Sequence, residues 1–278
     1  MRIALVGMKT LSEPDPDAAP LLRALREAGH VAQVIAWDDD RPRDAPESFD
    51  VCLLRATWNY YLLPETFIRW VERTSRGSTL VNGPEVVRWN MHKRYLIELG
   101  AAGIPTIPTV CIDRGGEADL EQFGWSNVVI KPAISAASWQ TRRFDAGDTG
   151  ARSFLDALVQ DRDVLVQPFI REVAAGGELA MVWIDGQLTH AVVKAPRFHG
   201  GDERVMPRPD LDDRHRDFAR EVMAAARQDV LYARIDVIEL KDGSLMLSEL
   251  EMIEPSLYFE YCDGAIPRFV AAVERLAP

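Results

Sequence analysis

Two Asp-Gly dipeptides restrict the fold of this chain more than any other feature of its sequence. Asp185-Gly186 and Asp242-Gly243 each lie between two apolar, strand-like runs, within residues 179–193 and 233–250. Asp-Gly in this position favours a β-hairpin, because both residues tolerate the left-handed conformation that tight turns need. The C-terminal two thirds of the chain are therefore predicted to form an α+β unit rich in antiparallel strands.

The first 80 or so residues follow a different pattern. Strand-like runs at Ile3–Val6, Val31–Ala36 and Val51–Leu54 alternate with a helical segment that starts near Ala18. Alternating strands and helices predict a parallel sheet with right-handed crossovers, and hence a small α/β domain. The G-x-G-x-x-G fingerprint of dinucleotide-binding domains is absent from this region.

A single helix is expected between the two regions, from about Glu85 to Gly103. Gly103 and the prolines at 105 and 108 mark its end. Further strands are expected at Val128–Ile130 and Val164–Val166, and a polar loop is expected over residues 197–213.

Composition excludes several classes of function. The formal net charge is −11 and the pI is about 5.0, which argues against general binding to nucleic acids or anionic membranes. The three cysteines and five histidines lack metal-site or redox spacing, and no apolar run is long enough for a signal peptide or a membrane span. We expect a soluble cytoplasmic protein, with a homodimer as the base-rate assembly.

Three carboxylates form the most informative motif. Asp236 lies on one strand of the second predicted hairpin, and Glu249 and Glu251 lie two residues apart on the other, so they share a face. Acids that converge within apolar strands need a cation, and a set of oxygen ligands alone suits Mg²⁺. Arg234 shares the face of Asp236. The alternative is an acidic strand face that is simply solvated.

Lysines in two contexts favour phosphate binding. Lys131 and Lys194 each end an apolar strand, and Lys131 is followed by a loop of small and hydroxyl residues over 133–141. Small side chains allow backbone N–H groups to approach phosphate oxygens. Lys93 lies on the linker helix. Taken singly, each lysine is more often a surface residue than a phosphate ligand.

The ordered set of motifs resembles the ATP-grasp superfamily over about residues 86–265. The motifs are Lys93, Val-Ile-Lys131-Pro, Val-Gln167-Pro-Phe-Ile170, Gly177-Glu178, Lys194, Ala-Arg234-Ile-Asp236 and Glu249-x-Glu251. The resemblance implies an α/β pre-ATP-grasp domain at 1–85 and a two-lobed ATP-grasp domain with antiparallel sheets at 86–278, whose smaller lobe covers about 104–168. Three segments look most like the branch of glutathione synthetase and the cyclo-ligase that closes D-cycloserine: 55–60, 89–93 and 249–256.

The resemblance also implies a role for each motif. Lys93 and Lys131 would contact the α- and β-phosphates of ATP, and the loop with Ser135 and Ser138 would cover them. The segment Gln167-Pro-Phe169-Ile170 would read the adenine edge, and Glu178 would hold the ribose. Lys194 and Arg234 would act in catalysis on the transferring phosphoryl group. Asp236, Glu249 and Glu251 would hold two Mg²⁺ ions, with Mn²⁺ as an alternative.

This sequence departs from the family pattern at two places. The phosphate loop has Ser135, Ala136, Ala137 and Ser138 where glycines are usual, and Glu251 stands where Asn is frequent. The loops at 135–141 and 197–213 are candidates for a lid over the reaction.

The resemblance implies an ADP-forming ligase that joins a carboxylate to an amine, or closes a ring, through an acyl phosphate. An amino-acid-like substrate is expected at Arg55, whose guanidinium would emerge at the end of the strand 51–54, with Trp58 and Ser256 nearby. The alternative is that Arg55 makes a surface ion pair and that Trp58 packs against the helix at Phe67–Trp70. The alternative functions are a phosphotransferase and a non-catalytic nucleotide- or ligand-binding protein.

Overall fold

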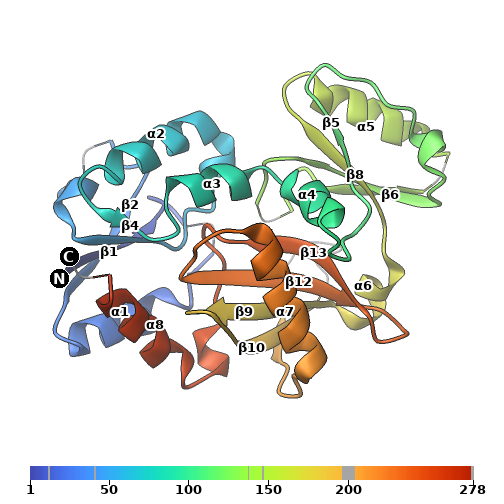
Figure 1. Ribbon diagram of the computed structural model, residues 1–278. Helices are drawn as coiled ribbons and strands as arrows, with labels where there is room; N and C mark the ends of the chain where they lie inside the picture. The colour runs from blue at the N-terminus through green and yellow to red at the C-terminus, as the bar shows by residue number, and fades with distance from the viewer. Residues whose placement is uncertain (12, 41, 137, 146, 196–203, 277–278) are drawn as a thin grey trace.

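The chain forms three separate β-sheets, each with its own helices (Figure 1). The structure is a computed structural model that describes residues 1–11, 13–40, 42–136, 138–145, 147–195 and 204–276. Within these ranges, none of the helices is both long enough and apolar enough to cross a bilayer.

The N-terminal sheet is parallel, as predicted, with the strand order β2-β1-β3-β4. Its buried strands place Ile3 and Leu5 on one side and Ala4 and Val6 on the other, which matches the continuous apolar run in the sequence. The elements are β1 (Arg2–Gly7), α1 (Ala18–Glu27), β2 (Val31–Ala36), η1 (Pro46–Ser48), β3 (Val51–Leu54), η2 (Tyr60–Leu62), α2 (Pro64–Thr74) and β4 (Thr79–Leu80).

The linker contains two helices where the sequence predicted one. These are α3 (Pro84–Met91) and α4 (Tyr95–Ala101). His92 between them is extended, with φ −100° and ψ 112°, and the backbone N–H of Lys93 donates to the carbonyl of Ala133 at 2.8 Å. This contact with the next lobe takes the place of a helical hydrogen bond, which helical periodicity does not reveal.

The smaller lobe is a four-stranded sheet with the order β5-β8-β6-β7, and every strand pair in it is antiparallel. Helix α5 packs on one face through Leu155 and Leu158. The elements are β5 (Val110–Ile112), η3 (Leu120–Phe123), β6 (Asn127–Pro132), β7 (Arg142–Asp145), α5 (Thr149–Val159) and β8 (Val164–Pro168).

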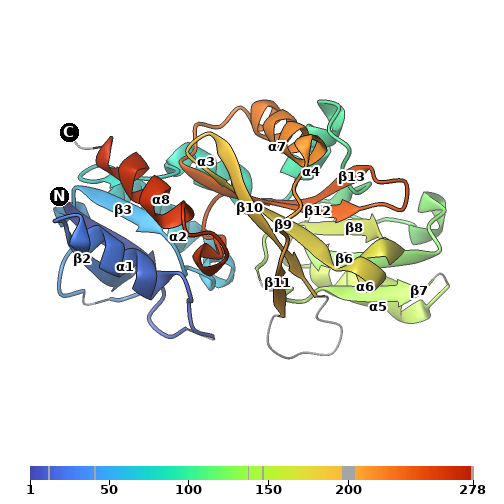
Figure 2. The same cartoon turned by 90° about the horizontal axis from the view of Figure 1, so that it is seen from below.

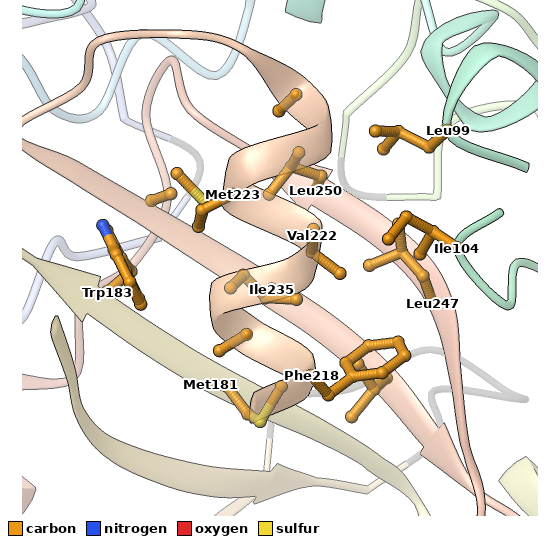
Figure 3. Close-up of a cluster of buried hydrophobic side chains, with 14 of the residues drawn as sticks. Leu99, Ile104, Met181, Trp183, Phe218, Val222, Met223, Ile235, Leu247 and Leu250 are labelled. Carbon is orange, nitrogen blue, oxygen red and sulfur yellow. The ribbon is translucent and has the colours of Figure 1, made fainter. Parts of the chain in front are cut away.

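The larger lobe is a five-stranded sheet with the order β11-β10-β9-β12-β13. Both predicted hairpins are present; at the first turn, Asp185 has φ 51° and Gly186 has φ 75°. Helix α7 covers one face and buries Phe218 and Val222 against Ile235 of the sheet (Figure 3). The elements are α6 (Arg171–Gly176), β9 (Glu178–Ile184), β10 (Gln187–Lys194), β11 (Val205–Pro207), α7 (Asp213–Ala226), β12 (Tyr232–Glu239), β13 (Leu245–Glu251), η4 (Phe259–Tyr261) and α8 (Ala265–Glu274).

The end of the chain returns to its beginning. Helix α8 lies beside α1 of the N-terminal sheet, as the view from below shows (Figure 2). One hydrophobic cluster joins Leu5 and Leu21 to Val182, Tyr232 and Phe269. The parallel sheet and the larger lobe therefore share a core. The division of the chain at residue 85 stays a prediction.

Candidate active site

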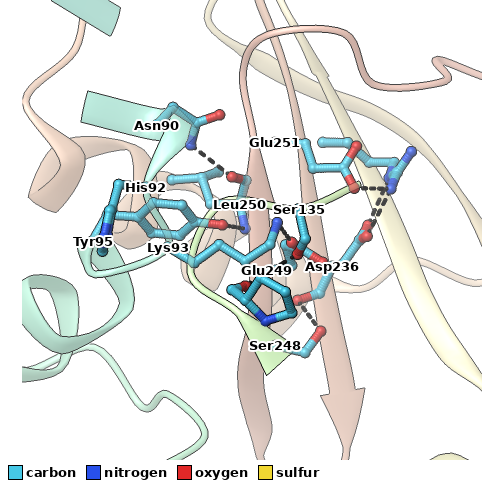
Figure 4. A network of polar contacts seen from close by, with 12 residues as sticks. Asn90, His92, Lys93, Tyr95, Ser135, Asp236, Ser248, Glu249, Leu250 and Glu251 are labelled. Atoms are coloured by element: carbon cyan, nitrogen blue, oxygen red, sulfur yellow. Dashed lines mark hydrogen bonds and ion pairs between the residues drawn. The ribbon is translucent and has the colours of Figure 1, made fainter. Parts of the chain in front are cut away.

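The second hairpin brings the predicted acids together in pairs. Asp236 lies opposite Glu249, and Arg234 lies opposite Glu251, in the antiparallel pairing of β12 and β13. Lys93 from the linker reaches Glu249, and Asp236 and Glu251 lie beside this pair (Figure 4). The register therefore places the three acids and Arg234 within reach of one another.

A chain of ion pairs connects these groups. Arg234 donates to both oxygens of Asp236, at 2.8 and 2.9 Å, and to Glu251 at 2.6 Å. Lys194 contacts Asp236 at 2.5 Å and Glu178 at 2.8 Å, while Lys93 pairs with Glu249. The cationic and anionic side chains thus alternate through the site. This arrangement offsets the penalty of burying each charge.

These groups line a cavity of about 520 Å³ between the two lobes and the N-terminal unit, a size common for small-ligand sites. The predicted site residues that line it are Trp58, Lys93, Lys131, Ser135, Ser138, Gln167, Phe169, Ile170, Glu178, Lys194, Arg234, Glu249, Glu251 and Ser256. Asp236 lies beneath its floor, with none of its surface exposed. Ala137 and residues 197–203, within the two candidate lids, are outside the described residues.

The break between α3 and α4 explains how Lys93 reaches the cavity. The backbone bond from Lys93 to Ala133 fixes the linker against the start of the phosphate loop. Asn90, one turn earlier, donates to the carbonyl of Leu250 at 2.7 Å and accepts from the N–H of Met252 at 2.7 Å. Linker and hairpin are thereby held in register, with Lys93 over Glu249.

Arg55 follows the end of β3, as the sequence predicted, but its side chain does not face a cavity. Its side chain is only 3% exposed and lines neither cavity described here. It donates to Asp17 at 3.2 Å and to the carbonyl of Pro255 at 2.9 Å. A carboxylate partner is thus supplied by the chain itself, because Asp17, the residue before helix α1, lies within reach of Arg55. Binding of a substrate carboxylate by Arg55 stays a prediction.

Trp58 and Ser256, the other two predicted substrate residues, lie together at the cavity. Both also line an adjoining cavity of about 490 Å³. Glu13, Tyr258 and Glu260 contribute to the walls of this second cavity. It therefore opens between the N-terminal unit and the segment that follows β13.

Comparisons with known proteins agree with this fold. Residues 3–82 match the family described as D-cycloserine synthetase DcsG, N-terminal domain. The chain is 28% identical over 306 aligned positions to the cycloserine biosynthesis protein DcsG of Streptomyces lavendulae, and 99% of each chain is covered. The crystal structure of D-cycloserine synthetase DcsG superposes with a TM-score of 0.89 at 28% identity, covering 99% of this chain and 100% of the other.

A structure of the ATP-grasp ligase PsnB, complexed with a minimal precursor, superposes with a TM-score of 0.65 at 19% identity and covers 98% of both chains. The chain has the ATP-grasp fold, and along its full length it is similar to D-cycloserine synthetase. The assignment of its three sheets to a pre-ATP-grasp domain and two ATP-grasp lobes stays a prediction.

The cavity of about 520 Å³ shifts the pKa values of its carboxylates in opposite directions. Burial opposes ionisation of Glu249, but Lys93 and Lys131 outweigh it and lower the pKa to about 2. Burial raises the pKa of Glu251 to about 7 against the attraction of Arg234, and Asp236 and Glu249 add to the rise. Burial also raises the pKa of Glu254 to about 8. The negative charge around Glu251 is therefore incompletely neutralised by the protein.

This charge and the chemistry of the donors fit a divalent ion such as Mg²⁺. Glu249 and Glu251 present carboxylate oxygens to the cavity, and oxygen is the ligand that Mg²⁺ prefers. Both oxygens of Asp236 are already bonded, to Arg234 and Lys194. Asp236 would have to exchange one of these bonds to hold the ion directly.

Sequence reasoning missed some residues of the site. Glu254 lines the cavity, and the repeated acids Glu249, Glu251 and Glu254 were a signal for it. Ser248 donates to Glu178 and to the carbonyl of Asp236, but nothing in the local sequence distinguishes it from a solvated serine.

A mixed cluster lies elsewhere in the described part of the chain. His92, Cys111 and Asp163 have their ligand atoms within 4.8 Å of one another, although they are distant in sequence. The Arg94 guanidinium lies 3.3 Å from the sulfur of Cys111 and 3.7 Å from Asp163. Because Arg94 already supplies the positive charge there, we assign no metal to this cluster.

Proposed function

We propose that this protein is an ADP-forming ligase that uses ATP to activate a small, amino-acid-like carboxylate as an acyl phosphate, which an amine then attacks. The observation that carries the proposal is the cavity itself. It gathers Lys93, Lys131, Lys194 and Arg234 around the acids of the β12–β13 hairpin, in a chain with the ATP-grasp fold. Its similarity to D-cycloserine synthetase along its full length supports an amino-acid-like substrate.

The nucleotide would lie along the cavity between the lobes. The segment from Gln167 to Ile170 would contact the adenine, and Glu178 the ribose. Gln167 is held by a bond of its side-chain amide to Thr109 at 2.8 Å, which keeps the end of β8 in place. Lys93 and Lys131 would neutralise the α- and β-phosphates, and the loop of Ser135 and Ser138 would cover them.

The chemistry needs positive charge because an anionic carboxylate must approach an anionic phosphate. Lys194 and Arg234 would stabilise the γ-phosphoryl group as the bond to the β-phosphate oxygen breaks and the bond to the carboxylate oxygen forms. Glu249, Glu251 and Asp236 would hold two Mg²⁺ ions, with Mn²⁺ as a substitute, which offset the remaining repulsion when bound. In the second step the amine displaces phosphate from the acyl carbon, and Arg234 would stabilise the oxyanion.

The substrate would bind where the two cavities meet, beside Trp58 and Ser256. Both residues line both cavities, so a molecule there would reach from the N-terminal unit toward Arg234 and Glu251. Trp58 offers an apolar wall and Ser256 a hydroxyl group.

The decisive experiment is a two-dimensional screen of small amino acids against amines, with Mg·ATP, that measures ADP and inorganic phosphate separately. A ligase releases both together. Hydroxylamine in place of the amine should trap the acyl phosphate as a hydroxamate. ADP without phosphate, with a stable phosphorylated product, would identify a phosphotransferase instead.

Glu249→Gln should abolish turnover while circular dichroism stays unchanged. A Glu249→Gln protein with full Mg²⁺-dependent turnover would remove this acid from the metal site.

A further inference from the structure

The phosphate loop between β6 and β7 has one large side chain that faces away from the cavity. Ser135, Ala136, Ser138 and Thr141 line the cavity, whereas Trp139 does not. The ring of Trp139 lies 4.9 Å from the ring of Tyr61 in η2 of the N-terminal unit. The two rings are tilted by 39°, and through this contact the phosphate loop packs against the N-terminal unit.

A second contact holds the other side of the loop. The Arg162 guanidinium lies 4.9 Å from the centre of the Trp139 ring, and its Nη1 donates to the side-chain oxygen of Gln140 at 3.3 Å. Arg162 precedes β8, the strand next to β6 in the sheet of the smaller lobe. Trp139 is therefore in contact with both the smaller lobe and the N-terminal unit.

The loop needs such contacts because its backbone is strained. Ser138 has φ 57° and Gln140 has φ 51°, the left-handed region that glycine adopts readily and other residues avoid. Both positions flank Trp139. The family's usual glycines would adopt this conformation without strain, so here side-chain contacts have to hold it.

The aromatic partner of Trp139 directly follows two residues of the cavity wall. Trp58 and Tyr60 line the cavity, and Tyr61 follows directly. Tyr61 and Ile134, at the start of the loop, both pack against the same hydrophobic cluster of the N-terminal unit. Any shift of segment 58–61 would therefore move the loop at two points.

We propose that Trp139 is a positioning residue for the nucleotide: its contacts with Tyr61 and Arg162 hold the phosphate loop closed and couple it to the substrate-facing segment 58–61. The inference rests on the proposed function for its meaning in catalysis. The effect of Trp139 on the loop can be tested without a known substrate, because the test needs only Mg·ADP to bind in the cavity. With these contacts broken, the loop relaxes and the phosphates lose the donors of Ser135 and Ser138.

The test measures Mg·ADP binding by calorimetry for Trp139→Ala, Tyr61→Ala and the double variant. Loss of one aromatic pair with its cation–π contact should weaken binding roughly tenfold. The double variant should be no weaker than either single variant, because both remove the same contact. Trp139→Phe should restore most of the affinity. The matched control is Trp125→Ala, which removes a stack on Phe123 in the same lobe, away from the cavity, and should leave ADP affinity unchanged.

A second readout follows the loop directly. Arg142 and Arg143 are exposed just after the loop, so trypsin cleavage there should be faster in Trp139→Ala, and Mg·ADP should protect it less than it protects the parent protein. Wild-type affinity and wild-type cleavage in Trp139→Ala would overturn the proposal. So would additive losses in the double variant. A failed ligase screen with intact ADP binding would overturn the proposed function alone.

Discussion

At the scale of single residues, Glu249 and Glu251 show how two similar acids on one strand face acquire opposite properties. Lys93 holds Glu249 in its ionised form, while burial beside Asp236 and Glu249 favours the protonated form of Glu251. A group whose folded pKa is raised destabilises the fold as pH rises from its ordinary value to the raised one. The opposite holds for a group whose pKa is lowered.

Glu251→Gln should therefore stabilise the nucleotide-free protein above pH 7. Between pH 4.5 and about 7 the unfolded chain loses this proton while the folded chain keeps it, and the variant removes that penalty. We expect a gain of about 2 kcal/mol at pH 8, or roughly 4–8 °C in Tm, and no gain near pH 4.5. Glu249→Gln should instead destabilise the nucleotide-free protein at pH 8, because it loses the ion pair with Lys93. Thermal unfolding in EDTA across this pH range measures both, and equal signs would refute the assignment.

Lys194 and Lys131 also differ in how the protein compensates their charge. Lys194 pairs with the fully buried Asp236, whereas the side chain of Lys131 makes no ion pair or hydrogen bond within the described ranges, and burial lowers its pKa. Lys194→Met should lower the Tm of the free protein by several degrees, since breaking a buried pair costs about 3–5 kcal/mol. Lys131→Met should not lower it. Both should reduce the rise in Tm caused by Mg·ADP, and NAD(H) should cause no rise in any of these proteins. A large Tm loss for Lys131→Met alone would contradict this.

At the scale of elements, Gly177 joins α6 to β9 where backbone packs on backbone. Its φ is 76°, and a Cβ atom there would lie 2.5 Å from the carbonyl oxygen of Lys194. The glycine allows β9 and β10 to approach so closely that Glu178 and Lys194 form their ion pair. A side chain at this position would force the strand ends apart.

Gly177→Ala should lower stability by at least about 2 kcal/mol and reduce the Mg·ADP shift, because both φ and the close approach oppose a Cβ. Gly176→Ala is the matched control. It ends the preceding helix, has no heavy atom within 4 Å of its added Cβ, and should be neutral or slightly stabilising. Thermal shift with and without nucleotide compares the two. Equal behaviour of both variants would show that the approach at 177 is not restrictive.

At the scale of the whole molecule, the N-terminal unit is fixed to the larger lobe by buried polar contacts. Asp17 accepts from Arg55 and from the N–H groups of Leu257 and Phe259, at 3.2, 2.6 and 3.0 Å. Asn82 donates to two carbonyls, those of Tyr232 and Met252, at 2.8 and 2.7 Å. These contacts, with the shared hydrophobic core, make the two units one cooperative structure.

Asp17→Asn and Arg55→Lys should therefore destabilise the entire chain by about 3 kcal/mol, since each disrupts a buried ion pair. Unfolding followed by calorimetry should show one transition at a lower Tm. Arg88→Lys, which alters an exposed pair with Glu72, should change Tm by less than about 2 °C. If Arg55→Lys leaves the Tm unchanged and instead raises the KM of a substrate, Arg55 belongs to the substrate site after all.

Local structure, which depends on neighbours along the chain, could be predicted from the amino-acid sequence. Periodicity and Asp-Gly turns located the parallel strands and both hairpins, because strand alternation and turn geometry are local properties. The spacing of Glu249 and Glu251 placed them on one face for the same reason. The ordered motifs also identified the superfamily.

The partner of each charged side chain could not be predicted in this way and became known from the folded structure. Asp17 reaches Arg55 and Lys93 reaches Glu249 across separations of 38 and 156 residues, which no local pattern records. Such contacts also determine three other features of the fold: the end of helix α3 before Lys93, the ring contact of Trp139 with Tyr61, and the direction of each pKa shift. Electrostatic and packing energies depend on distance in space, and folding brings together groups that the sequence keeps apart.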